Sequence, residues 1–211
     1  MYEENAEIIQ LSFNSTKDDE RITFIDKGYW FNFKTGKIHY TCRIRPARAA
    51  RFIKESDTEL EVLQPDKLFV YPGKINCRIR WEEAKKRKVN SNDIATLLEN
   101  AETDYTAVVN RVKESFRDPL SELNPAILIK LHKAFINGDH LVLEDEQGGL
   151  LTVADLSRDN APTSGLLRVV LPAQPKRLAL LVEVNDDTLS NLFSVKPLSI
   201  VTSDKVIRLL Y

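Results

Sequence analysis

The spacing of apolar residues changes twice along the chain, and these changes constrain the expected fold more than any motif. Up to residue 88 the apolar runs are short, and the run Glu59–Leu63 alternates polar with apolar residues as a half-buried strand does. From Asn90 the apolar period becomes 3.6 residues, with two stripes between positions 92 and 117. Strand-length runs return from residue 140 onward. The order predicted is therefore strands, then helices, then strands.

A third helix is predicted directly after the two apolar stripes. Asn124 is a good N-cap residue and Pro125 suits the first helical position, because its missing N–H would have no partner there. The apolar run that follows reaches Gly138, a common helix stop. We expect an α+β fold with a basic antiparallel β-rich domain over 1–88, a helical segment over 89–138 and a small C-terminal β-sheet or barrel over 139–211. The first domain should contain one short helix, which begins at Pro46.

Composition indicates an ordinary globular protein. The chain has 211 residues, of which 43% are hydrophobic, and no apolar run approaches the roughly 20 residues that cross a bilayer. Its first residues lack the basic start and apolar core of a secretory signal, so we expect a cytoplasmic protein with no membrane partner. In that reducing compartment the two cysteines should be free thiols.

The formal net charge of −1 conceals a strong segregation of charge. Residues 27–88 hold 16 basic and 7 acidic side chains, whereas the segments on either side are acidic. The same 62 residues hold 9 of the 17 aromatic side chains. A basic segment interleaved with aromatic residues is typical of a surface that binds nucleic acid.

The tetrapeptide CRIR occurs twice in this basic segment, at 42–45 and at 77–80. In a strand, each copy would direct its cysteine and isoleucine toward the core and both arginines outward. If the two strands share a sheet, four guanidinium groups share a surface that suits phosphate. The resulting hypothesis is a non-enzymatic module that binds nucleic acid or another polyanion. Its candidate residues are Arg43, Arg45, Arg48, Arg51, Arg78, Arg80, Lys85, Lys86, Arg87, Tyr29, Trp30, Tyr40 and Tyr71.

Two alternatives remain open. In a protein-interaction or scaffold domain, the arginines would only cover a solvated sheet and pair with acids such as Glu59 and Glu61. A metal-dependent nuclease is the third reading, because Asp66 followed by Glu83 and Lys85 resembles the spacing of the PD-(D/E)xK motif. There, two acids would hold a divalent metal and the lysine would help to activate water.

The sequence gives no reason to expect a cofactor, a metal or a catalytic residue. Phosphate-binding glycine loops and the GxSxG nucleophile motif are not found in it. A zinc site would need His39 and Cys42 together, but positions three apart on a strand face opposite sides. The expected partners are therefore nucleic acid or another protein.

Overall fold

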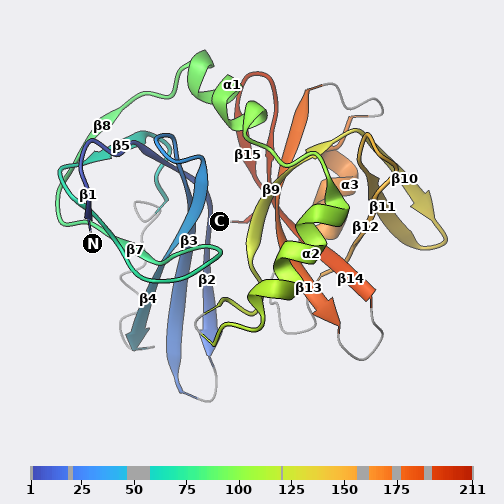
Figure 1. The fold of residues 1–211 in the computed structure, drawn as a ribbon, viewed down its shortest axis with the longest axis horizontal. Coiled ribbons are helices and arrows are strands. Elements are labelled where there is room, and N and C mark those ends of the chain that lie inside the picture. The colour runs from blue at the N-terminus through green and yellow to red at the C-terminus, as the bar shows by residue number, and fades with distance from the viewer. Residues whose placement is uncertain are drawn as a thin grey trace.

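Strands dominate the computed structural model, which describes residues 2–18, 21–46, 58–119, 121–155, 162–172, 177–187 and 192–210 (Figure 1). The N-terminal strands are β1 (Tyr2–Glu3), β2 (Ile8–Asp18), β3 (Thr23–Asn32), β4 (Lys37–Pro46), β5 (Val62–Pro65), β6 (Leu68–Val70), β7 (Ile79–Arg80) and β8 (Ala84–Arg87). Two helices follow, α1 (Ser91–Glu99) and α2 (Tyr105–Ser115). The remaining elements are β9 (Ala126–Leu131), β10 (Lys133–Asn137), β11 (His140–Glu144), β12 (Leu150–Val153), α3 (Ser164–Val170), β13 (Leu178–Asp187), β14 (Leu192–Val201) and β15 (Val206–Arg208).

The N-terminal strands form a small Greek-key barrel. Strands β2, β3 and β4 make an antiparallel meander, and β5 pairs antiparallel with β2. The barrel closes where Tyr40 of β4 pairs in parallel with Arg78, directly before β7. Strand β8 extends the sheet beside β5, while β6 and β1 continue from β7 as a three-stranded sheet. A three-strand meander whose final strand lies parallel to a later segment, here β4 beside Arg78, is the arrangement of an OB-type barrel.

The C-terminal strands form a second barrel, in which the final strand of a meander again pairs in parallel with a later strand. The sheet runs β10-β11-β12-β14-β13-β9, and β12 pairs in parallel with β14. Because only His132 separates β9 from β10, the two ends of the sheet belong to one continuous stretch of chain and the sheet closes on itself. Helix α3 lies in the connection between β12 and β13, and β15 adds to β14. Figure 1 shows the two barrels side by side, with α1 and α2 in the connection between them.

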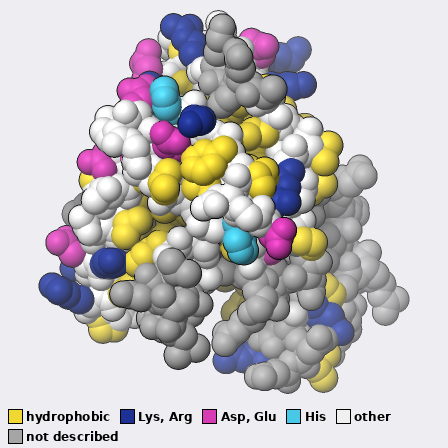
Figure 2. Space-filling view, turned by 90° about the vertical axis from the view of Figure 1, so that its right-hand side faces the viewer, with side chains coloured by type: hydrophobic (Ala, Val, Ile, Leu, Met, Phe, Trp, Pro, Cys, Tyr) yellow, Lys and Arg dark blue, Asp and Glu magenta, His cyan; other side chains and the backbone are white. Residues whose placement is uncertain are grey.

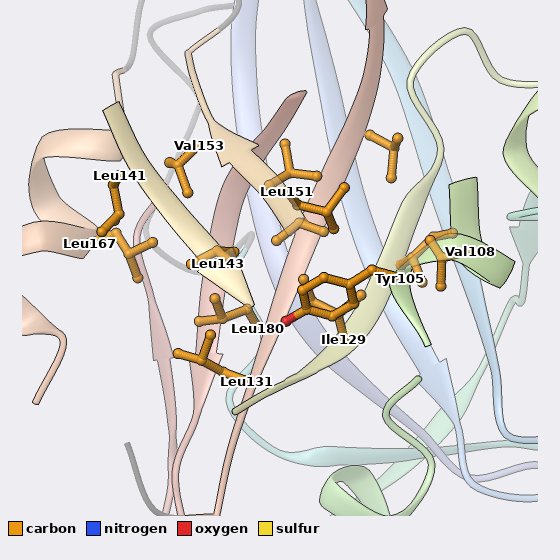
Figure 3. Packing of buried hydrophobic residues seen from close by; sticks show 14 of the residues in the cluster. Tyr105, Val108, Ile129, Leu131, Leu141, Leu143, Leu151, Val153, Leu167 and Leu180 are labelled. Carbon is orange, nitrogen blue, oxygen red and sulfur yellow. The ribbon is translucent and has the colours of Figure 1, made fainter. Parts of the chain in front are cut away.

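The two barrels have three apolar cores, one inside each barrel and one between them. One fills the C-terminal barrel, where Leu143 and Leu180 pack with Tyr105 of α2 and Leu167 of α3 (Figure 3). A second fills the N-terminal barrel around Trp30. The third lies between the barrels and joins residues of β2, β3 and α1 to β9, β13 and β14. Burial of this shared core, at roughly 25 cal/mol per Å² of apolar surface, stabilises one barrel against the other.

The predicted fold class was wrong, because this is a mostly β protein whose described helices are three short ones. The third predicted helix is instead strands β9 and β10. Residues Ile127 and Ile129 of β9 face the C-terminal core, whereas Leu128 faces the core between the barrels. A strand that is buried on both faces has a continuous apolar run, and periodicity cannot separate it from a buried helix.

Other parts of the prediction agree with the structure. The N-terminal part is β-rich, and the two apolar stripes form α1 and α2. Helix α1 begins at Asn90, whose side chain accepts from the backbone N–H of Asp93 at 3.0 Å while the Asp93 carboxylate accepts from that of Asn90 at 2.8 Å. No described helix has the length and apolar character required to span a membrane. The short helix predicted after Pro46 lies outside the described residues, and the division at 88 and 138 stays a prediction.

Candidate nucleic-acid interface

The two CRIR copies lie next to each other in the N-terminal barrel. The backbone N–H of Tyr40 donates to the carbonyl of Cys77 at 3.2 Å. The Arg78 guanidinium, from the second copy, donates to the carbonyl of Cys42 at 3.0 Å, in the first copy. The two copies of this tetrapeptide, which are 35 positions apart in the sequence, are therefore adjoining segments where the barrel closes.

Beyond this contact the two segments border a hollow, which we call the arginine cleft. Its volume is about 500 Å³. Arg43 stands on the β4 side, and Arg78 and Arg80 stand on the β7 side. The lining is completed by Gln10, Phe13, Asp26, Trp30, Thr41, Cys42, Ile79 and Trp81. Trp30 and Trp81 meet edge to face with their ring centroids 4.9 Å apart.

The arginine cleft has an excess of positive charge. Among the described residues, no carboxylate lies within salt-bridge distance of Arg43 or Arg78, and the nearest carboxylate to Arg80 is that of exposed Glu82 at 3.8 Å. An exposed pair at that distance contributes little. Among the described lining residues the one acid is Asp26, which is already bonded to the Arg45 guanidinium and accepts from the Ser15 hydroxyl at 2.7 Å. The three arginines are therefore largely uncompensated.

Arg45 has a different environment from Arg43, although both residues belong to the first CRIR copy. Its side chain is only 13% exposed and is bonded to buried Asp26. The expected alternation also failed at Ile44, which is 61% exposed, whereas Ile79 of the second copy is buried as predicted. Ile44 pairs with Ile25 near the open end of the β3–β4 hairpin, away from its turn. There the long strands of the hairpin extend beyond the shorter strands of the barrel (Figure 1).

Two of the basic residues after Trp81, Lys86 and Arg87, pair with acids of the protein itself. Arg87 donates to both Asp93 oxygens, at 2.7 and 2.8 Å, and to both oxygens of Glu7, at 2.6 and 3.2 Å. These bonds lower the pKa of Glu7; they also lower the pKa of Asp93 against the opposing effect of burial. Lys86 pairs with Glu59, and exposed Lys85 lines a different hollow. Arg48 and Arg51 lie outside the described residues.

The aromatic residues that were predicted to contact nucleic acid also differ in their environments. Tyr29 is buried, and its hydroxyl donates to Glu183 of β13 at 2.7 Å, so it links the two barrels. Burial raises the pKa of this hydroxyl. Tyr40 is half-buried beside Lys27, and Trp30 is buried beneath the cleft. Tyr71 is 43% exposed, and the Arg78 guanidinium lies 5.7 Å from its ring centroid.

Sequence reasoning missed two aromatic residues next to the cleft. Phe69 lies opposite Arg80 across β6 and β7, with the guanidinium 5.4 Å from its ring centroid. On the other side of β6, Tyr2 of β1 lies opposite Phe69, with 6.1 Å between ring centroids. The Pro72-Gly73 turn was the available signal, because folding the chain back there sets the runs KLFVY and KINCRIRW opposite each other.

The described residues show no metal centre of the kind that the nuclease hypothesis requires. Asp66 and Glu83 are opposite each other where β5 and β8 meet, with the Asp66 N–H donating to the Glu83 carbonyl at 3.3 Å, and both residues are exposed. Within the described ranges, no group of three or more His, Cys, Asp or Glu side chains is placed to hold a metal ion.

The C-terminal barrel presents a different surface. Figure 2 views the molecule from the side on which β10 and β11 lie in Figure 1. On this face Lys and Arg side chains are scattered among hydrophobic and acidic ones rather than gathered in a hollow.

Comparisons with known proteins do not identify a family. No protein-family model matches the chain, and no curated protein matches it. Among solved structures, one described as "Structure of murine DNA binding protein bound with ds DNA" is similar at 12% sequence identity. The similarity covers 97% of this chain and 96% of that chain, with a TM-score of 0.35. A TM-score of this size does not establish a shared fold.

Proposed function

We propose that this protein binds nucleic acid through its N-terminal barrel, with the phosphate backbone held in the arginine cleft. The observation that carries the proposal is the convergence of Arg43, Arg78 and Arg80 on one hollow in which Asp26, the one acid among the described lining residues, is already bonded to Arg45. Guanidinium groups bind phosphate through paired hydrogen bonds and keep their charge at any physiological pH.

The hollow has the size of a ligand site. Its volume of about 500 Å³ falls in the range of roughly 300 to 1,000 Å³ that is typical of ligand pockets, and most of its described lining residues belong to strands. OB-type barrels are a common scaffold for oligonucleotide binding, which is an analogy at the level of architecture.

The scaffold alternative is supported by part of the basic segment only. Lys86 and Arg87 pair with Glu59, Glu7 and Asp93, as that reading requires. These pairs lie outside the arginine cleft, so they neutralise Lys86 and Arg87 and, among the described residues, leave the charge of the cleft arginines uncompensated.

The test is fluorescence anisotropy with labelled oligonucleotides at about 50 and 200 mM salt, on the wild type and on the double variant Arg43→Met/Arg78→Met. Each lost phosphate contact should reduce the slope of log K against log salt by roughly 0.7 to 0.9. Lys85→Met is the matched control, since it removes one exposed cation outside the cleft. Equal slopes in the double variant and the control, or no wild-type binding at the lower salt, would contradict the proposal.

A further inference from the structure

The outer face of the three-stranded sheet β1-β6-β7 carries a ladder of aromatic rings and guanidinium groups. Tyr2, Phe69 and Arg80 form one rung across the three strands. Tyr71 and Arg78 form the next, since the Tyr71 N–H donates to the Arg78 carbonyl at 2.9 Å. We call these five residues the stacking ladder.

Two of the three rings of the stacking ladder are exposed, Tyr2 at 49% and Tyr71 at 43%, and the Phe69 ring is half-buried. The guanidinium groups of Arg78 and Arg80 lie 5.7 and 5.4 Å from the centroids of Tyr71 and Phe69. A planar guanidinium held against a ring is itself a surface on which a nucleobase can stack.

The stacking ladder and the arginine cleft share two residues. Arg78 and Arg80 line the cleft and also cover the rings of the ladder. A nucleic acid whose phosphates reach these arginines therefore brings its bases within reach of the rings.

The spacing of the rungs selects an unpaired strand. Phe69 and Tyr71 are two residues apart along one strand, which separates them by roughly 6.6 Å. Consecutive bases in a duplex are only about 3.4 Å apart and are already stacked on each other. A single strand can open its bases to the wider interval, whereas a duplex would first have to unstack and unpair.

We propose that the ligand is single-stranded nucleic acid, with its phosphates in the arginine cleft and its unpaired bases stacked on Phe69 and Tyr71. This inference rests on the proposed function and specifies its ligand. It adds Tyr2 and Phe69, which lie outside both CRIR copies and the lining of the arginine cleft, to the candidate base-binding face.

The first test uses the wild-type protein and three probes of equal length: a single strand, a hairpin duplex and an abasic single strand. The abasic strand keeps the phosphates and lacks the bases. We expect the normal strand to bind at least about fivefold more tightly than the abasic strand, because one stacked base is worth roughly that factor or more. Equal affinity for the normal and abasic strands, or tighter binding of the duplex, would overturn the inference.

The second test uses Phe69→Leu/Tyr71→Leu, which keeps apolar bulk and removes both ring faces. We expect it to lose the preference for the normal strand and to bind the abasic strand as the wild type does. Phe135→Leu is the matched control, because Lys133 covers that ring at 5.3 Å on the other barrel. A double variant that keeps the full preference would overturn the inference.

Failure of this inference is distinguishable from failure of the proposed function. If bases contribute nothing, the Arg43→Met/Arg78→Met variant still lowers the salt slope on the abasic strand. Polyglutamate of matched charge serves as a competitor for the acidic-peptide alternative. Displacement of the normal strand at equal charge concentration would show that the surface recognises charge alone, and would overturn the assignment of bases to the ladder.

Discussion

Replacing Arg45 should destabilise the fold, whereas replacing Arg43 two residues earlier should not. Arg45 is bonded to Asp26, which is only 6% exposed. Removing one partner of a buried ion pair costs about 3 to 5 kcal/mol, because the other charge stays buried without compensation. The Ser15 hydroxyl still donates to Asp26 at 2.7 Å, so the lower figure applies to Arg45→Met.

The assay is thermal unfolding at neutral pH, followed by circular dichroism. For a chain of this length 1 kcal/mol corresponds to roughly 2 to 4 °C, so Arg45→Met should lower the Tm by about 6 to 12 °C. Arg43→Met removes an exposed side chain and should change the free energy of unfolding by less than about 0.5 kcal/mol. Adding Asp26→Asn to Arg45→Met should recover part of the loss. Equal Tm shifts for the two arginine variants would refute the reasoning.

Two further perturbations concern contacts that join the elements. Arg87→Met should destabilise the protein at neutral pH and flatten its acid unfolding. The pKa values of Glu7 and Asp93 are lowered in the fold, so the stability that these carboxylates contribute is present above their unfolded pKa values and is lost as the pH falls through the lowered ones. A Tm measured against pH that stays parallel to wild type would count against this. Asn76→Ala should lower the free energy of unfolding in urea by about 2 to 4 kcal/mol. The buried Asn76 side chain accepts from the Ala126 N–H at 2.6 Å and donates to the Ala126 carbonyl at 2.8 Å, and the residue has a positive φ of 52°. A loss below about 1 kcal/mol would contradict that role.

Much of the local structure could be predicted, because the decisive signals were local. The hairpin of β3 and β4 follows from the two strand-like runs YWFNF and KIHYTCRI and from Gly36 between them, which adopts a φ of +67° in the turn. Helix α1 follows from its apolar stripe. The barrel closures were not predictable, because they depend on pairings such as Tyr40 with Arg78 that join distant segments.

The candidate site was predictable to a similar extent. The doubled CRIR motif indicated Arg43, Arg78 and Arg80, but no feature of the sequence separated Arg43 from Arg45. That difference comes from the register of β3 and β4, which sets Asp26 opposite Arg43 and within reach of Arg45. The ladder rings of Tyr2 and Phe69 depend on strand pairing in the same way.

The most direct test of the arginine cleft uses the intrinsic fluorescence of the protein. The chain has two tryptophans, Trp30 and Trp81, and both line the cleft. Titration with an unlabelled single strand should therefore change the tryptophan emission, with the same midpoint as the anisotropy titration, and Trp81→Phe should remove most of the change, since Trp30 is buried. Binding by anisotropy that leaves the tryptophan emission unchanged would place the ligand elsewhere and contradict the account.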